Sequence, residues 1–220
     1  MSMFSKGGRR TGRLRQFLRR RTRTHPQRRP ELDCKTFPSL FRKRAIVFTD
    51  TADFTLRTAR DGILHFLMVF EAVSAIARKV VRSTGGEVVK VDGDSLLIRY
   101  DDVNDAVRGV LALDDTLQAF NRQRPENEQV HFSYGVGYGD VLDIDDDMFG
   151  LEVNLASKIG EDLAEPGEAL LTPSAAAALE PAMLKRVVPY RIVTFGKQAF
   201  PVHRFKLRGR LPRGKVSRRP

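Results

Sequence analysis

The sequence predicts a single α/β (α+β) domain in which helices pack on a mixed or antiparallel β-sheet. Short β-rich runs alternate along the chain with longer segments whose apolar residues recur at helical spacing. The chain has 220 residues, of which 41% are apolar, and this suffices for one core but not for two full domains. No apolar run approaches the roughly 18 residues that a membrane-spanning helix needs, so an integral membrane enzyme is not expected.

The first half of the domain is predicted as a strand, a long helix and a hairpin. Residues 45–49 (AIVFT) are β-rich and are followed at once by polar residues. Residues 62–81 place eight apolar side chains at helical spacing, and a Gly-Gly pair ends this helix. The apolar runs 88–91 and 95–100 flank the tight polar turn Asp-Gly-Asp, which predicts a β-hairpin.

The second half of the domain is predicted to continue this alternation. Residues 107–120 have the spacing of another amphipathic helix, which ends before Pro125. The remaining elements are expected at 130–136 and 141–144 (strands around a Gly-Tyr-Gly turn), 153–159 (the start of a helix), and 169–171, 187–195 and 200–205 (strands). No internal repeat is present. This order predicts one layer of helices over the sheet.

Basic residues are concentrated at the two ends of the chain. The formal net charge is +11, yet the middle of the chain is acidic, because the first 44 residues hold 15 Lys and Arg and the last 15 hold seven. Both ends are poor in apolar residues, so we expect them to be mobile. The predicted division is a basic, disordered N-terminal tail (1–43), a folded domain (44–206) and a basic C-terminal tail (207–220).

The basic tails could hold the protein near anionic lipid or nucleic acid, but a solvated extension is the favoured interpretation. No apolar stretch follows the arginines at 19–21, so neither a secretory nor a twin-arginine signal is expected. We therefore expect a cytoplasmic protein, with peripheral membrane association through the tails as the alternative. The single cysteine, Cys34, excludes an internal disulfide and has no companion at metal-binding spacing.

Two aspartates are candidates for metal binding. Asp50 follows the first predicted strand, and Asp94 lies at the tip of the predicted hairpin. A carboxylate pair together with substrate phosphates suits Mg²⁺ or Mn²⁺, as phosphoryl chemistry requires. Aspartate is also a common turn residue, and on spacing alone a simple turn is favoured over a metal site.

Four sequence blocks together form a much more specific pattern. They are FTDTADFT (48–55), GEVVKVDGD (86–94), GVGYGDV (135–141) and DMFGLEVNLASK (147–158). In order and spacing, the pattern resembles the catalytic domain of the class III adenylate/guanylate cyclases across the predicted domain. The resemblance implies a ferredoxin-like βαββαβ core and a head-to-tail homodimer with its active sites at the subunit interface.

The resemblance also implies roles for individual residues in phosphate and metal binding. Asp50 and Asp94 match the aspartates that hold two Mg²⁺ or Mn²⁺ ions per site. The backbone from Thr51 to Phe54 matches the loop that cradles the triphosphate, and Thr51 also counts among the metal ligands. The reaction implied is attack of the ribose 3′-hydroxyl on the α-phosphorus, which yields a 3′,5′-cyclic nucleotide and pyrophosphate.

Two further positions concern the purine base. Lys90 and Asp147 match the lysine and its acidic partner in the adenylate-specific members of the family. A donor to purine N1 and an acceptor from the 6-amino group favour adenine, because guanine presents the reverse pattern. ATP is therefore the expected substrate, with GTP or a pyrimidine triphosphate as alternatives.

Three more residues match the pattern with different degrees of fit. Asn154 matches the asparagine that orients the ribose, although an asparagine early in a helix is also a common cap. Lys158 stands where the family usually has a transition-state arginine, and lysine keeps the charge but lacks the planar fork, so slower turnover is expected. Lys197 resembles a residue that contacts the terminal phosphates, and a solvated loop lysine is equally favoured.

The sequence thus predicts a nucleotidyl cyclase, a phosphorus–oxygen lyase of intracellular signalling, that acts as a homodimer. The departure at Lys158 keeps a second hypothesis open, a non-catalytic cyclase-homology dimer that binds a nucleotide. A third hypothesis is a nucleic-acid-binding protein that acts through its arginine-rich ends.

Overall fold

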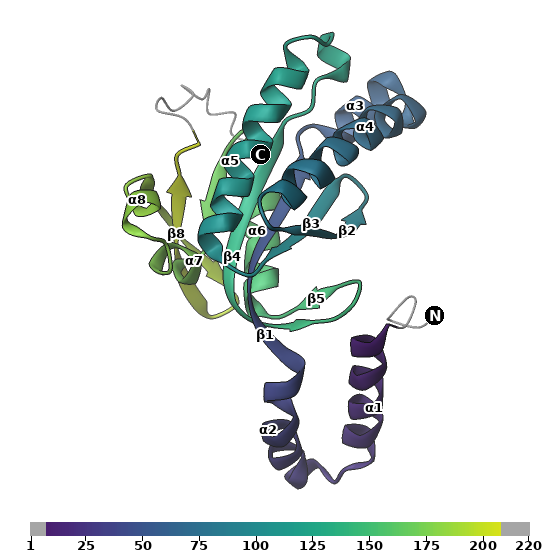
Figure 1. Cartoon of the computed structure of the whole chain (residues 1–220), viewed down its shortest axis with the longest axis vertical. Helices are drawn as coiled ribbons and strands as arrows, with labels where there is room; N and C mark the ends of the chain where they lie inside the picture. The colour runs from purple at the N-terminus through teal and green to yellow at the C-terminus, as the bar shows by residue number, and fades with distance from the viewer. Residues whose placement is uncertain (1–7, 208–220) are drawn as a thin grey trace.

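The computed structural model describes residues 8–207, and one eight-stranded sheet forms its centre (Figure 1). The first seven residues and the predicted C-terminal tail from residue 208 on lie outside the described residues. The strands are β1 (Phe41–Thr51), β2 (Glu87–Asp92), β3 (Ser95–Tyr100), β4 (Phe132–Asp143), β5 (Met148–Phe149), β6 (Ala169–Leu171), β7 (Val187–Phe195) and β8 (Gln198–Phe205). The helices are α1 (Arg9–Arg23), η1 (Pro26–Arg28), α2 (Arg29–Leu40), α3 (Phe54–Asp61), α4 (Ile63–Ser83), α5 (Val103–Asn121), η2 (Glu126–Glu128), α6 (Leu151–Asp162), α7 (Pro173–Ala177) and α8 (Pro181–Leu184).

The sheet has the strand order β2-β3-β1-β4-β6-β8-β7, and the short β5 pairs with β4. β1 lies between β3 and β4 and is antiparallel to both, whereas β4 and β6 are parallel. The chain order β1-α4-β2-β3-α5-β4 combined with this sheet order is a ferredoxin-like βαββαβ unit. The predicted fold class is therefore confirmed.

Helices cover both faces of the sheet. On β1, Ala45 and Val47 belong to the large core that α4 and α5 close. Ile46, between them in sequence, points to the other face and packs with Val153 and Ala156 of α6. The prediction of a single helical layer was therefore wrong, since α6 lies on the opposite face from α4 and α5.

Strand β4 is a single strand of 12 residues, where the sequence predicts two strands around a Gly-Tyr-Gly turn. Its glycines serve close packing rather than a turn. A Cβ atom on Gly135 would lie 1.9 Å from the carbonyl oxygen of Ala156 in α6, and one on Gly137 would lie 2.6 Å from that of Glu152. The strand therefore continues because α6 lies directly against its backbone.

The segment before the domain forms two helices, α1 and α2, where the sequence predicts a mobile tail (Figure 1). Leu14 of α1 and Leu32 of α2 are buried, and Arg21 pairs with Asp33 across the two helices at 2.8 Å. Both helices thus gain apolar and ionic partners that the local composition does not indicate. Among the helices between residues 8 and 207, none has the length and apolar character needed to cross a membrane.

Candidate active site

The fold brings the two predicted metal-binding aspartates to neighbouring strand ends. Asp50 is the penultimate residue of β1, and Asp94 lies in the turn between β2 and β3. β3 pairs with β1, so this turn lies beside the end of β1. The buried Thr51 hydroxyl donates a 2.7 Å hydrogen bond to the carbonyl oxygen of Asp94 and fixes the turn there.

The electrostatic environment of these aspartates is unfavourable for anions. Burial, and then the negative charges of Asp94, Glu161 and Asp162, raise the pKa of Asp50 to about 6. Burial also raises the pKa of Asp94 above its ordinary value. A bound cation would relieve this concentration of negative charge, because its positive charge would compensate the carboxylates directly.

The carboxylates of Asp50 and Asp94 suit Mg²⁺ or Mn²⁺ when oxygens of a bound substrate complete the coordination of the ion. No cluster of three or more His, Cys, Asp or Glu side chains arranged to hold a metal ion occurs among residues 8–207. Two carboxylates, with water and phosphate oxygens, are nevertheless the set that Mg²⁺ takes in nucleotide enzymes. Since the Thr51 hydroxyl already bonds the turn, a metal contact from Thr51 would use its backbone oxygen.

The loop after β1, predicted to cradle the triphosphate, leads directly into the first turn of α3. Asp53 adopts a left-handed conformation with φ of 59°, which turns the chain sharply into α3. The Phe54 ring packs edge-to-face on the Phe66 ring, with 4.7 Å between the ring centroids, so the Phe54 side chain anchors the first turn of α3. The N–H groups of that turn have no partners within the helix and carry partial positive charge, which suits an anion.

The two predicted base-recognition residues also lie together. The Lys90 ammonium is 3.6 Å from a carboxylate oxygen of Asp147 and 2.9 Å from one of Asp92, which the sequence analysis did not assign. The hydrogen bond from Lys90 to Asp92, with support from Asp147, raises the pKa of the lysine. The second oxygen of Asp147 accepts a 2.9 Å bond from the Met148 amide, so its orientation is fixed by the backbone.

Helix α6 presents the predicted ribose and transition-state residues on its exposed face. Asn154 and Lys158 are four residues apart and therefore lie one above the other. The Lys158 ammonium forms an ion pair with Asp162, one turn further on. Burial raises the pKa of Glu161, and Asp94 contributes to this. Neither acid was predicted from the sequence, although their spacing from Lys158 places them on the same side of the helix.

The two halves of the predicted site lie near opposite ends of α6. Asp147 precedes the first residue of this helix by four positions, whereas Asp50 is close to Glu161 and Asp162 at its last turn. The helix is roughly 18 Å long. In a single chain, the metal half and the base half are therefore well separated.

Lys197 lies exposed in the turn between β7 and β8, at the far edge of the sheet from β2. No ion pair among the described residues joins it to the other predicted site residues. One cavity of about 630 Å³ lies along α1 and is lined by Arg15, Arg19, Arg20 and Arg23 among others. None of the predicted site residues lines it.

Comparison with curated proteins finds partial matches to adenylate cyclases. Over 126 residues, 57% of this chain and 21% of the relative, the chain is 31% identical to "Putative adenylate cyclase 3" of Rhizobium meliloti. Over 136 residues, 62% of this chain and 34% of the relative, it is 32% identical to an adenylate cyclase of Streptomyces coelicolor. The chain thus spans between a fifth and about a third of these relatives. No protein-family model matches the chain.

Comparison with solved structures finds the same fold in cyclase domains. An adenylate/guanylate cyclase/hydrolase from Silicibacter pomeroyi superposes with a TM-score of 0.63 at 21% identity, over 75% of this chain and 96% of the other. The guanylate cyclase domain of RhGC from Catenaria anguillulae, in complex with GTP, superposes with a TM-score of 0.66 at 17% identity, over 74% of this chain and 96% of the other. The adenylyl cyclase CyaB from P. aeruginosa superposes with a TM-score of 0.63 at 17% identity, over 76% of this chain and 94% of the other. The chain therefore has the fold of the class III adenylate/guanylate cyclase catalytic domains, and part of its sequence is similar to bacterial proteins named adenylate cyclase.

Proposed function

We propose that this chain is the catalytic domain of a homodimeric, metal-dependent adenylate cyclase that converts ATP to 3′,5′-cyclic AMP and pyrophosphate. The observation that most strongly supports the proposal is the pair Asp50 and Asp94, which Thr51 holds together at neighbouring strand ends. The test is the formation of cyclic AMP from ATP by the purified protein with Mg²⁺ or Mn²⁺, and its loss when EDTA removes the metal.

The reaction requires positioning more than covalent chemistry from the protein. The ribose 3′-oxygen forms a bond with the α-phosphorus, the bond from that phosphorus to the oxygen of the β-phosphate breaks, and the hydroxyl proton passes to water or to the departing pyrophosphate. When bound, Mg²⁺ or Mn²⁺ would supply Lewis-acid stabilisation of the phosphate charge. Asp50 and Asp94 would hold the ions, the first turn of α3 would hold the triphosphate, and Asn154 would orient the ribose.

Lys90 and Asp147 would select adenine. Lys90 would donate to purine N1, and Asp147 would accept from the 6-amino group. The 3.6 Å separation of these two side chains supports their action as one recognition unit.

Exchanging donor and acceptor at these two positions should reverse the base preference. In Lys90→Glu/Asp147→Asn, a carboxylate would face the N1–H of guanine and an amide could donate to O6. We expect the ratio of kcat/KM for ATP to that for GTP to fall about 100-fold, since two recognition pairs each contribute roughly 1–3 kcal/mol. Steady-state kinetics with both nucleotides measure this ratio. An unchanged ratio would contradict the assignment of Lys90 and Asp147 to the base.

A dimer is proposed because the two halves of the site are separated in one chain. Helices α3 and α4 also expose large apolar side chains, with Leu56 67%, Leu64 80% and Met68 56% exposed. Apolar residues gathered on adjacent helices indicate a surface that another protein covers. A second copy of this chain would bury such residues and place the base half of one subunit against the metal half of the other.

Two impaired variants should complement each other if the site is shared. Asp50→Asn removes a metal ligand and Asp147→Ala a base contact, so each variant alone should be strongly impaired. In a randomly exchanged mixture, half of the dimers combine the two variants and keep one intact site of two, so about a quarter of wild-type activity should return. Refolding the variants together and measuring cyclic AMP tests this. Recovery below one hundredth of the wild-type rate, with dimer exchange verified by mass, would contradict a shared site.

A second candidate function is a nucleotide-binding dimer without turnover. The ion pair between Lys158 and Asp162 favours this second function, because Lys158 already binds an acid of its own chain and is the residue predicted to stabilise the transition state. Lys158→Arg restores the planar fork, and under the cyclase proposal we expect kcat to rise about 10-fold and KM to change little. Lys158→Ala, which removes the charge, should lower kcat. If nucleotide binds but neither substitution changes a measurable rate, the non-catalytic function is favoured.

A further inference from the structure

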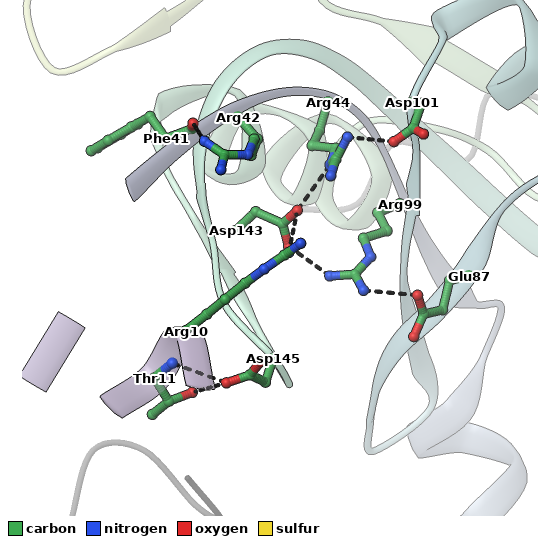
Figure 2. A network of polar contacts seen from close by, with 10 residues as sticks. All are labelled: Arg10, Thr11, Phe41, Arg42, Arg44, Glu87, Arg99, Asp101, Asp143 and Asp145. Carbon is green, nitrogen blue, oxygen red and sulfur yellow. Dashed lines mark hydrogen bonds and ion pairs between the residues drawn. The ribbon is translucent and has the colours of Figure 1, made fainter. Parts of the chain in front are cut away.

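Three alternating acids, Asp143, Asp145 and Asp147, lie between the end of β4 and the start of β5, and Figure 2 shows the first two with their partners. Asp143 ends β4, and its side chain is completely buried. Its oxygens lie 2.8 Å from Arg44 of β1 and 2.6 Å from Arg99 of β3. Arg10 of α1 approaches the same carboxylate at 3.1 Å. The first acid of the segment thus ties the N-terminal helix to the sheet.

The second acid, Asp145, caps helix α1. One of its oxygens accepts hydrogen bonds from the Thr11 amide at 2.9 Å and from the Thr11 hydroxyl at 3.0 Å. The helix has no side-chain cap of its own, since its N-cap residue is Gly8. Thr11 is completely buried, so the first turn of α1 packs closely on this segment. These bonds lower the pKa of Asp145, consistent with an anion at a helix N-terminus.

The third acid, Asp147, is the predicted base-recognition residue. The Ile144 amide donates a 3.0 Å bond to the Asp147 carbonyl oxygen, which closes the segment into a tight turn around Asp145. Asp145 and Asp147 are thus held in one turn, two positions apart, and we expect a displaced Asp145 to shift Asp147. Figure 1 places the N-terminal end of α1 beside this turn.

We propose that helix α1 is a structural part of the base half of the site, and that Asp145 is the positioning residue through which its docking holds Asp147 beside Lys90. This inference rests on the proposed function for its effect on nucleotides, but not for its structural content. A partner or domain that pulls α1 away from the turn would loosen Asp147 without contact with the substrate.

Two glycines at the start of helix α1 provide a matched test. A Cβ on Gly8 would lie 2.2 Å from Cγ of Asp145, whereas a Cβ on Gly12 would meet no atom within 4 Å. Gly8→Ala should therefore displace the carboxylate, and Gly12→Ala should leave it in place. Asp145→Ala removes the cap directly and serves as a second variant if Gly8→Ala folds poorly.

Amide hydrogen exchange at Met148 reports the position of Asp147, because this amide donates to the Asp147 carboxylate. We expect Gly8→Ala and Asp145→Ala to speed its exchange at least about 10-fold, and Gly12→Ala to leave it unchanged. The Ile98 amide of β3 should exchange at the wild-type rate in all three variants, which excludes global destabilisation. In active protein, the first two variants should raise KM for ATP several-fold more than they lower kcat.

The outcomes separate this inference from the proposed function. Equal Met148 exchange in Gly8→Ala, Asp145→Ala and Gly12→Ala would overturn the inference, whatever the enzymatic activity. Faster exchange in the first two variants of a protein that makes no cyclic nucleotide would support the docking and contradict the proposed function.

Discussion

Substitution of Asp50 by asparagine should raise the melting temperature of the metal-free protein and abolish nucleotide cyclisation. The Asp50 carboxylate is half-buried beside Asp94, Glu161 and Asp162, and its pKa is about 6 against an ordinary value of 3.8. A carboxyl group whose pKa is raised by folding favours the folded state when neutral and opposes it when ionised. Asparagine has nearly the same shape and no charge, so it removes this opposition.

The size and pH dependence of the effect follow from the same shift. Well below pH 3.8, Asp50 is neutral in both folded and unfolded chains and does not distinguish the variant from the wild type, and at pH 4 only a small part of the difference has developed. Above pH 6 the ionised carboxylate opposes folding in full. Solvent screening of a half-exposed group limits the gain to about 1 kcal/mol, which is roughly 3 °C for a domain of this size.

Calorimetry at pH 4 and pH 8 measures this gain, with the exposed Asp115 of α5 changed to asparagine as the control. Addition of Mg²⁺ or Mn²⁺ together with a non-cyclisable ATP analogue should stabilise the wild type more than Asp50→Asn, because only the wild type keeps both carboxylates of the site. The cyclase rate of the variant should fall about 1,000-fold. A variant that melts at or below the wild-type temperature at pH 8, or that retains activity, would contradict this account of Asp50.

Substitution of Asp143 by alanine should destabilise the fold more than any other single carboxylate change considered above. Asp143 is completely buried, and it is the shared partner of Arg10, Arg44 and Arg99. Its removal leaves these guanidinium groups facing one another without the central anion. Breaking a buried ion pair by removing one partner costs roughly 3–5 kcal/mol, and we expect about 3 kcal/mol because the arginines keep some solvent contact.

Asp101 offers a matched control for Asp143, because it pairs with the same Arg44 but its side chain is 88% exposed. Asp101→Ala should change the free energy of unfolding by less than about 1 kcal/mol. Urea unfolding of the two variants and the wild type compares them directly. Equal loss of stability in Asp143→Ala and Asp101→Ala would show that the buried network does not stabilise the fold as described.

The regular elements that the sequence predicts are those whose patterns are local. The polar turn between two apolar runs correctly predicts the hairpin of β2 and β3, and helical spacing correctly predicts α4 and α5. The glycines of β4 mislead, because their role depends on α6 packing against the strand. Helix α1 was missed for a similar reason, since its cap is Asp145, 134 residues further along the chain from Thr11.

The candidate site likewise contains residues that the sequence pattern identifies and residues that only the fold brings near. The sequence pattern pairs Lys90 with Asp147, and the structure places them together. Glu161 and Asp162 were missed because the last of the four sequence blocks ends at Lys158, and their closeness to Asp50 depends on how α6 crosses the sheet. Their roles, and those of Asn154 and Lys197, remain predictions.

Cyclisation of a nucleoside triphosphate at the site built on Asp50 and Asp94 can be measured directly. The experiment is a product analysis by chromatography and mass spectrometry after incubation of the wild type and Asp50→Asn with each of the four ribonucleoside triphosphates and Mg²⁺ or Mn²⁺. We expect equal amounts of 3′,5′-cyclic AMP and pyrophosphate from ATP with the wild type, and neither product with the variant. Absence of any cyclic nucleotide, release of inorganic phosphate alone, or equal product from both proteins would contradict this expectation.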